Sequence, residues 1–168
     1  MPRSFDMATD YDSGVGEVHA ALSDERYWLA RLARSGADEA RLDAMTVGSD
    51  GGIDVVTTQV LRSDRLPSVV SQFHRGDLEI RREETWSPLQ GPRADATVSG
   101  GIAGAPVSLA GTVELSGDDE RCTLALRADV EVRVPLVGRK LENFIGNQLR
   151  ELLVAEQRFT TAWIAGEC

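Results

Sequence analysis

The chain has 168 residues, a net charge of −9, 42% hydrophobic residues and 27% charged residues. These proportions are typical of folded globular proteins and exclude global disorder, and the length fits one domain, so we expect a single domain over residues 1–168. The acidic balance also disfavours nonspecific binding to nucleic acid or to an anionic membrane surface.

The start of the chain predicts a strand followed by two short helices. Residues 3–12 alternate apolar and polar side chains, as a half-buried strand does, and the alternation ends at Gly14. Residues 15–22 suit a short helix. Ser23 is expected to cap a second helix, which continues to a helix stop signal at Gly36.

The middle of the chain predicts strands separated by turns. The glycine pair that follows Asp50 is a hairpin signal. Pro67 interrupts the strand pattern, and a short helix or bend is expected at 68–75. The expected strands are 39–47, 53–62, 77–86, 93–103 and 106–116.

The segment 121–134 gives the clearest strand pattern of the chain. Apolar and polar side chains alternate over its whole length, so a shift of one residue would expose the entire apolar set. The sheet must therefore have one covered face and one solvated face, as antiparallel sheets commonly do. The apolar side consists of Cys122, Leu124, Leu126, Ala128, Val130, Val132 and Val134.

A helical period replaces the alternation after Pro135. The helix is expected over 141–163 and could run about 25 residues, or roughly 38 Å. Nothing else in the chain is large enough to cover the sheet, so the helix and the sheet must bury each other. The apolar stripe of the helix consists of Leu141, Phe144, Ile145, Leu149, Leu152, Phe159 and Trp163.

Two polar residues, Gln148 and Glu156, interrupt this apolar stripe. In the strand 77–86, Arg82 and Glu84 share the parity of the apolar residues. These four side chains could form a polar group that orients a mostly apolar ligand in an internal cavity. They could instead form an internal salt bridge or reach solvent at the open end of the sheet, since long side chains readily do so.

The other residues with reactive or metal-binding side chains form no recognisable motif. His19 and His74 have no Cys or acidic partner at metal-ligand spacing, so no metal is expected. No catalytic or cofactor-binding motif is present, so the catalytic residues are unknown and no cofactor is expected. Cys122 and Cys168 form no CxxC motif and are too few for a disulfide framework.

The start of the chain and its hydropathy bear on location. Several aspartates and no apolar core occupy the first dozen residues, which excludes a signal peptide. No apolar run approaches the roughly 20 residues needed to cross a bilayer. We therefore expect a cytoplasmic monomer or homodimer with no stable membrane insertion and no nucleic-acid partner.

The order of strand, two short helices, antiparallel strands and one long closing helix resembles the helix-grip fold of the START-like superfamily, also called SRPBCC or Bet v 1-like. The segments 134–145 and 83–86 and the pair Leu66-Pro67 further resemble an uncharacterised bacterial branch of that superfamily. The resemblance implies an α+β fold in which a curved antiparallel sheet wraps around a long C-terminal helix. It also implies a deep cavity between the two, which often holds a lipid, a sterol or a polyketide.

The resemblance therefore predicts binding or transport of a hydrophobic small molecule. The alternative is an enzyme like a polyketide cyclase/aromatase or a dehydratase, in which burial raises the pKa of a carboxyl such as Glu84 or Glu156. A third possibility is an interaction module with a vestigial cavity and an exposed apolar patch. The expected ligand-binding residues are Phe73, Arg82, Glu84, Trp86, Gln148, Leu149, Leu152, Glu156 and Phe159.

Overall fold

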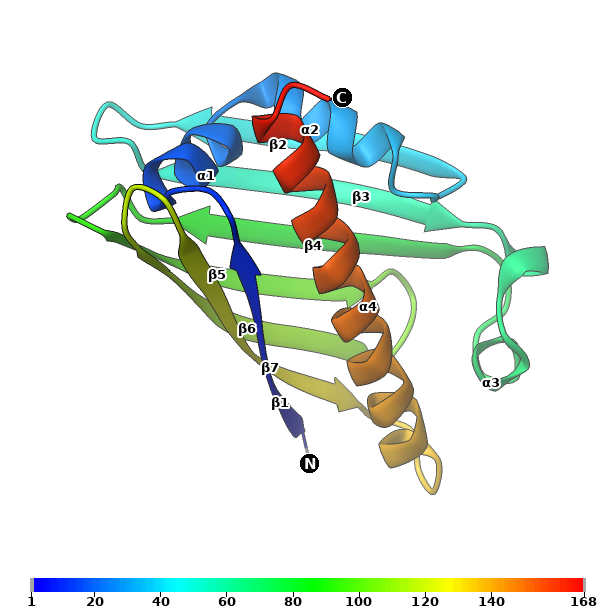
Figure 1. The fold of residues 1–168 in the computed structure, drawn as a ribbon. Coiled ribbons are helices and arrows are strands. Elements are labelled where there is room, and N and C mark those ends of the chain that lie inside the picture. Colours follow the sequence, from blue (N-terminus) through cyan, green and yellow to red (C-terminus); the bar gives the residue numbers. More distant parts are fainter. Residues whose placement is uncertain (1, 168) are drawn as a thin grey trace.

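The computed structural model describes residues 2–167 and shows one curved antiparallel sheet with a long helix crossing its concave side (Figure 1). The expected α+β fold is confirmed. Cys168 lies outside the described residues. In chain order the elements are β1 (Arg3–Tyr11), α1 (Val15–Leu22), α2 (Glu25–Ala33), β2 (Glu39–Val47), β3 (Ile53–Leu61), a 3-10 turn (Ser63–Arg65), α3 (Ser68–Ser71), β4 (Leu78–Trp86), β5 (Arg93–Ile102), β6 (Val107–Gly117), β7 (Cys122–Val132) and α4 (Gly138–Ile164).

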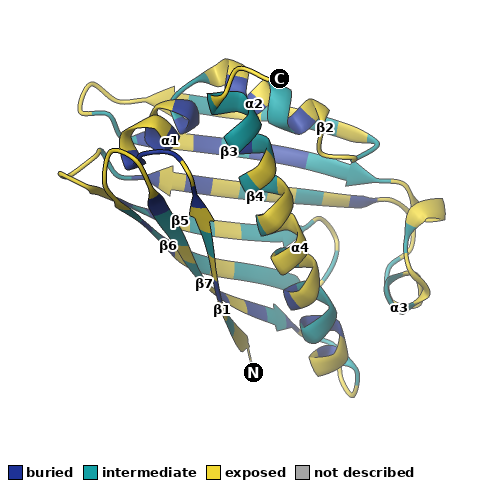
Figure 2. Ribbon diagram, in the orientation of Figure 1, coloured by how far each residue is buried: buried dark blue, intermediate teal, exposed yellow. Residues whose placement is uncertain are grey.

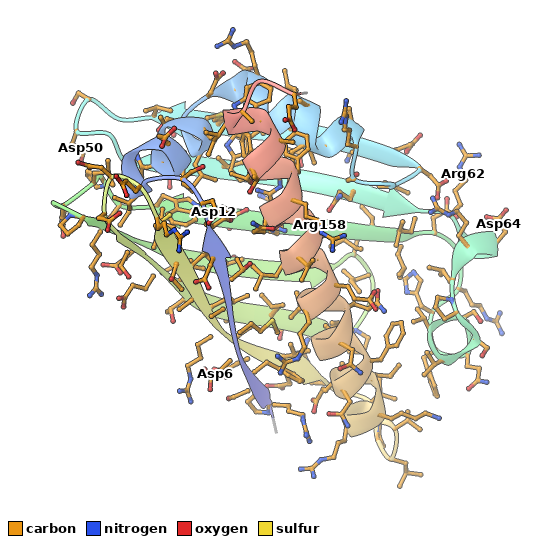
Figure 3. The ribbon with its side chains drawn as sticks, viewed as in Figure 1. Asp6, Asp12, Asp50, Arg62, Asp64 and Arg158 are labelled. Atoms are coloured by element: carbon orange, nitrogen blue, oxygen red, sulfur yellow. The ribbon has the colours of Figure 1, made fainter. Side chains whose placement is uncertain are left out.

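The seven strands lie in the order β1-β7-β6-β5-β4-β3-β2, and every neighbouring pair is antiparallel. The alternation predicted for 121–134 appears in β7, where Ala128, Val130 and Val132 are buried while Arg127 and Asp129 are exposed. The apolar face of the sheet is therefore its concave side. Charged side chains such as Asp6, Asp12 and Asp50 lie on the exposed periphery (Figure 3).

Local chemistry sets the element boundaries. Gly51 has φ +96°, a conformation that favours glycine, and the Asp50 carboxylate accepts a hydrogen bond from the Gly52 amide at 2.9 Å in the predicted hairpin. The cap of α2 is Asp24 and not Ser23, since the Asp24 carboxylate accepts from the Arg26 amide at 2.9 Å.

The position of α4 is asymmetric. The helix packs along β1 and β7 and crosses α1 and α2, while its contacts with the strands on the β2 side of the sheet are sparse among the described residues. Gly146 permits the close approach to β1, because a Cβ atom at this position would lie 2.2 Å from the ring of Phe5. The Gln157 side chain also donates to the Asp10 carbonyl at 3.0 Å. The helix therefore covers one side of the concave face and leaves the other partly open.

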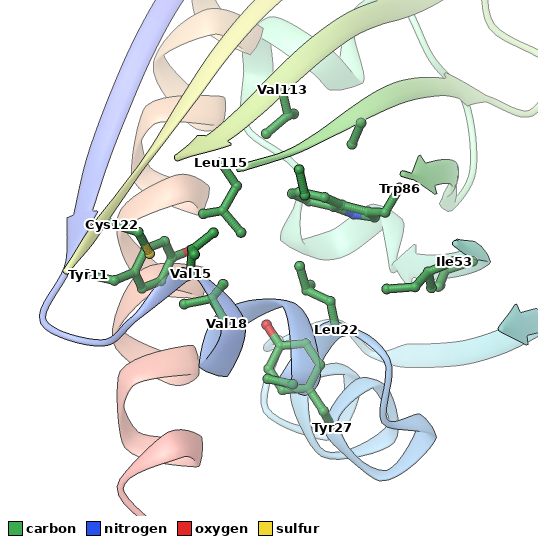
Figure 4. Close-up of a cluster of buried hydrophobic side chains, with 14 of the residues drawn as sticks. Tyr11, Val15, Val18, Leu22, Tyr27, Ile53, Trp86, Val113, Leu115 and Cys122 are labelled. Atoms are coloured by element: carbon green, nitrogen blue, oxygen red, sulfur yellow. The ribbon is translucent and has the colours of Figure 1, made fainter. Parts of the chain in front are cut away.

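The main core lies at the end of the sheet that α1 and α2 close (Figure 4). Burial raises the pKa of the Cys122 thiol to about 11, so this residue serves as a small apolar side chain, as its strand position predicts. His19 is also buried, and its Nε2 lies 3.0 Å from the Ser87 carbonyl oxygen. The cluster contains Tyr11, Val15, Val18, Leu22, Tyr27, Trp28, Ile53, Trp86, Val113, Leu115 and Cys122, among others.

Candidate functional site

On β3, β5 and β6, burial decreases along the concave face from the closed end to the open end of the sheet, whereas β7 stays buried at its open end beside α4 (Figure 2). On β6, Leu115 and Val113 are buried, whereas Leu109 on the same face is only half-buried. Across from these strands, the apolar Leu152 of α4 is 36% exposed. Apolar side chains on both sides of the space between α4 and the sheet are thus incompletely covered, and we call this space the groove.

A small cavity of about 80 Å³ lies at the inner end of this groove. Four elements contribute to it, namely α2, β3, β4 and α4. A volume of this size is below the roughly 300 Å³ of ordinary ligand pockets, so a ligand of lipid size would also need the groove. The cavity is lined by Trp28, Arg31, Leu32, Arg34, Ser35, Thr57, Gln59, Arg82, Leu152, Ala155, Glu156 and Phe159.

Charged side chains from three elements meet at this cavity. The Arg82 guanidinium donates from Nε to Glu84 at 2.9 Å, and from Nη1 and Nη2 to the two carboxylate oxygens of Glu156 at 3.0 and 3.2 Å. Glu84 also accepts a hydrogen bond from the Trp86 indole at 3.3 Å. The structure therefore brings together three of the four polar residues that the sequence singled out.

Arg31 of α2 completes this group and was missed by the sequence reasoning. Its guanidinium pairs with Glu156, its side chain is only 11% exposed, and its Nη1 donates to the Tyr27 hydroxyl at 3.3 Å. It also lies 4.6 Å from the centroid of the Trp28 ring, a cation–π geometry. The sequence did offer one signal for it. Arg31 follows Trp28 by three residues and Tyr27 by four, so the three side chains lie on the same face of the short helix. We call Arg31, Arg82, Glu84 and Glu156 the ionic cluster.

The ionic cluster holds Glu156 in its charged form. Burial alone would raise the pKa of the Glu156 carboxyl, but the guanidiniums of Arg31 and Arg82 outweigh it and lower that pKa to about 2. This direction is opposite to the raised pKa expected for a catalytic carboxyl. Two guanidiniums and two carboxylates sum to no net charge, and no buried side-chain nitrogen or oxygen among the described residues lacks a hydrogen-bond partner.

The other expected site residues lie at various distances from the cavity. Leu152 and Phe159 line it, and Leu149 is half-buried on α4. Trp86 is 3% exposed and belongs to the main core, so it contributes to the site mainly through Glu84. Phe73 is 45% exposed in the connection after α3 and does not line this cavity.

Gln148 differs most from its expected place in the polar group. Its side chain is exposed, and no hydrogen bond between described residues involves it. Helical spacing still puts it one turn before Leu152, toward the open part of the groove. It is therefore separate from the ionic cluster.

A larger and more open hollow of about 920 Å³ lies against the outer face of the sheet. It includes a row of threonines, Thr85, Thr97 and Thr112, on three adjacent strands. These outward side chains are exposed. The hollow contains no buried charge cluster, so the inner cavity is the better candidate for a specific site.

The part of the chain that the structure describes has neither a metal-binding cluster nor a membrane-spanning helix. Among residues 2–167, no group of three or more His, Cys, Asp or Glu side chains could hold a metal ion. Within the same part of the chain, none of the helices combines the length and apolar character that crossing a membrane requires.

Known proteins share both the sequence and the architecture. Residues 6–164 match the model of a family described as "Protein of unknown function (DUF2505)". An uncharacterised protein of Mycobacterium tuberculosis is 49% identical over 170 residues, a match that covers 98% of each chain. Among solved structures, the Zhui aromatase/cyclase from Streptomyces sp. R1128 has a TM-score of 0.65 and 11% identity over 98% of this chain and 94% of that one.

A START superfamily protein from Mycobacterium smegmatis is similar with a TM-score of 0.56 and 8% identity, over 98% of this chain and 99% of that one. At such identities the likeness shows the fold alone. The chain therefore has the helix-grip fold of the START-like superfamily, as its order of elements predicted, and the relatives that it matches in sequence are uncharacterised.

Proposed function

Since this chain belongs to the DUF2505 family, whose description gives no activity, we propose from the geometry of the site that it binds or transports a hydrophobic small molecule. The ligand would be lipid-, sterol- or polyketide-like and would lie between α4 and the concave face of the sheet. Partly exposed apolar side chains on facing elements support this, because burying them against a ligand is favourable. The named structural neighbours show that this fold is shared by a START protein and a cyclase.

The single observation that carries the proposal is the position of the ionic cluster at the inner end of an apolar groove. Leu152 and Phe159 lie beside Arg82 and Glu156 in the lining of the same cavity. A mostly apolar surface with a few fixed polar groups at one end is the usual composition of small-molecule sites.

The charge balance of the cluster favours a ligand whose inner end is polar but uncharged. Each guanidinium already pairs with a carboxylate, as in the Arg31–Glu156 and Arg82–Glu84 contacts. A ligand carboxylate would have to displace one of these carboxylates and leave a charge unpaired in a poorly solvated place, which is costly. A hydroxyl or carbonyl could bind at the edge of the cluster without this cost.

Two fluorescent probes with the same ring skeleton test the proposal. Phenylnaphthylamine is uncharged, and anilinonaphthalene sulfonate is its anionic counterpart. We expect saturable fluorescence enhancement with the neutral probe and at least tenfold weaker binding of the sulfonate. Native mass spectrometry of the purified protein would additionally reveal a copurified ligand.

A matched pair of variants on α4 locates the probe. Leu152→Trp should fill the cavity and weaken binding of phenylnaphthylamine at least tenfold, because Leu152 lines it. Val154→Trp should have little effect, since Val154 is 46% exposed and helical geometry turns it away from Leu152. Equal binding by both variants, or no saturable binding by the unmodified protein, would contradict the proposal.

The alternative, a cyclase- or dehydratase-like enzyme, needs a carboxyl that can exchange a proton near neutral pH. The low pKa of Glu156 disfavours that residue as acid or base. Glu84 is the remaining buried carboxyl of the cluster, with a side chain that is 7% exposed. The experiment measures turnover of a candidate polyketide by the unmodified protein and by Glu84→Gln. Loss of turnover in a variant that still binds phenylnaphthylamine would favour the enzyme.

Several expectations remain proposals beside this one. We propose one START-like domain over residues 1–168, a cytoplasmic location and a monomer or homodimer. Analytical ultracentrifugation would establish the oligomeric state, and cell fractionation would establish the location.

A further inference from the structure

The connection between β7 and α4 carries a leucine in an unusual position. Leu136 is fully exposed, at 104% relative accessibility, and it is the only non-glycine residue with positive φ among the described residues, at +70°. A leucine rarely adopts this left-handed conformation, because its Cβ approaches the backbone carbonyl. Both the exposure and the conformation are unfavourable in the free chain and suggest that the side chain has a role outside it.

Basic residues surround this leucine in the sequence. The stretch 132–141 contains Arg133, Arg139 and Lys140 and no acidic residue, although the whole chain has a net charge of −9. Arg139 and Lys140 are exposed and form no ion pair with any residue in 2–167. We call residues 133–140 the basic tip.

The nearest acidic residues do not neutralise the basic tip. Glu142 is buried, and its carboxylate accepts the Val132 amide at 2.9 Å, so it points into the protein. Glu131 pairs with Arg133 at 3.7 Å, a weak exposed contact. Arg139 and Lys140 therefore project their charge into solvent beside Leu136.

The basic tip lies where the molecule is open. In Figure 1 it marks the N-terminal end of α4, away from α1 and α2, and α3 lies on the same open side. The connection after α3 exposes a second large apolar side chain, Phe73. The proposed groove leads from the ionic cluster toward this side.

We propose that the basic tip docks reversibly on an anionic lipid bilayer, with Leu136 in the headgroup region and Arg133, Arg139 and Lys140 against lipid phosphates. A membrane fits better than a protein partner, because one exposed leucine is far less than the roughly 1,200 Å² that a stable protein interface buries. An exposed apolar side chain beside cations instead matches the interfacial mode of membrane binding.

The net negative charge of the chain does not prevent this docking. The Debye length is about 8 Å at physiological ionic strength, so acidic residues farther from the tip than this are largely screened from a surface that the tip contacts. The docking should weaken steeply with added salt.

Flotation with lipid vesicles tests the proposal. The unmodified protein should bind vesicles of phosphatidylcholine with about a third phosphatidylglycerol, and much less those of phosphatidylcholine alone, at about 0.1 M salt. Arg139→Gln with Lys140→Gln should weaken binding roughly 25-fold, about fivefold for each cation. Leu136→Asn should weaken vesicle binding severalfold. The melting temperature of this variant should not fall below that of the unmodified protein, since asparagine tolerates positive φ.

The matched control is Leu29→Asn on α2. Leu29 is 50% exposed and lies at the closed end, so the same substitution there should leave vesicle binding unchanged. Absence of binding to anionic vesicles would overturn the proposal, as would binding that the tip variants do not weaken. Phenylnaphthylamine titration of Leu136→Asn separates this result from ligand binding, because the tip variant should retain the probe site.

Discussion

Arg31 of α2 and Glu156 of α4 form an ion pair that joins the N-terminal helices to the long C-terminal helix, with side chains only 11% and 20% exposed. Glu156 binds Arg82 of β4 at the same time, so one carboxylate connects three elements. Removing one partner of a buried ion pair destabilises the fold by more than the intact pair stabilises it, because the remaining charge is left uncompensated. The cluster should therefore stabilise the relative placement of α2, β4 and α4.

The pKa of Glu156 predicts how acid should affect stability. Because this pKa falls from 4.5 to about 2 on folding, the charged carboxylate stabilises the fold above about pH 4.5, and that contribution is lost as pH falls toward 2. The loss should be on the order of 3 kcal/mol. Urea unfolding between pH 5 and pH 2 measures it.

Glu156→Gln should be less stable at pH 7 and should show a shallower acid dependence than the unmodified chain. Glu83→Gln is the control, because Glu83 pairs with Arg81 on the exposed outer face at 2.8 Å. That substitution should change the free energy of unfolding by less than about 1 kcal/mol. An identical acid dependence in the unmodified chain and Glu156→Gln would contradict the assignment.

The Tyr27 hydroxyl lies 2.6 Å from the Thr160 hydroxyl, and Thr160 is 2% exposed. Thr160→Val should lower the free energy of unfolding by about 1–3 kcal/mol, because the buried phenol loses a partner with little change in shape. Thr161→Val is the neighbouring control. Its hydroxyl bonds locally within α4 and is only part-buried, so its loss should cost less than Thr160→Val. Equal effects in thermal or urea unfolding would argue against a stabilising Tyr27–Thr160 contact.

The sequence predicts the fold well because each of its two periods indicates which side of an element faces the core. The alternation in 121–134 identified the concave face of β7. The helical stripe of 141–163 identified the inner face of α4 only in part, since Leu141 is its one buried member, whereas Glu142, Gly146 and Thr160 are buried outside it. Strand parity placed Arg82 and Glu84 on the inner face of β4, and helical spacing placed Glu156 on the inner face of α4. The structure brings these three side chains into contact.

What the periods could not supply was tertiary placement. Helical spacing gives the apolar face of α4 but not the strands against which it packs, so the open groove on the β2 side and the exposed Gln148 were not predictable. Arg31 lies far from Glu156 in sequence, and only the crossing of α2 and α4 brings them together. The first helix turn of α2 was also misassigned, since Ser23 and Asp24 are adjacent residues that both favour caps.

Gly146 sets how closely α4 approaches β1. Gly146→Ala should destabilise the chain despite the better helix propensity of alanine, because the new Cβ would overlap the Phe5 ring. We expect a net loss of about 1–2 kcal/mol in urea unfolding. Gly16→Ala in α1 is the control, since nothing lies within 4 Å of its Cβ position, and it should stabilise by about 0.5–1 kcal/mol.

The double variant Phe5→Ala with Gly146→Ala identifies the cause. Phe5→Ala alone costs some packing, but adding Gly146→Ala to it should cost nothing further or restore stability. A loss that is the same in both backgrounds would mean that the clash lies elsewhere.

Two leucines on the inner face of α4 distinguish packed core from unfilled groove. Leu141 is 8% exposed and Leu152 is 36% exposed. Leu141→Ala should destabilise by about 2–4 kcal/mol, as buried leucines do, because it leaves a cavity between closely packed groups. Leu152→Ala should cost about 1 kcal/mol or less, since its side chain already faces incompletely filled space.

A bound apolar ligand should enlarge the effect of Leu152→Ala, because Leu152 would then contribute to a filled interface. Equal losses for the two variants in the ligand-free protein would show that the groove is packed core, and the binding proposal would lose its structural basis.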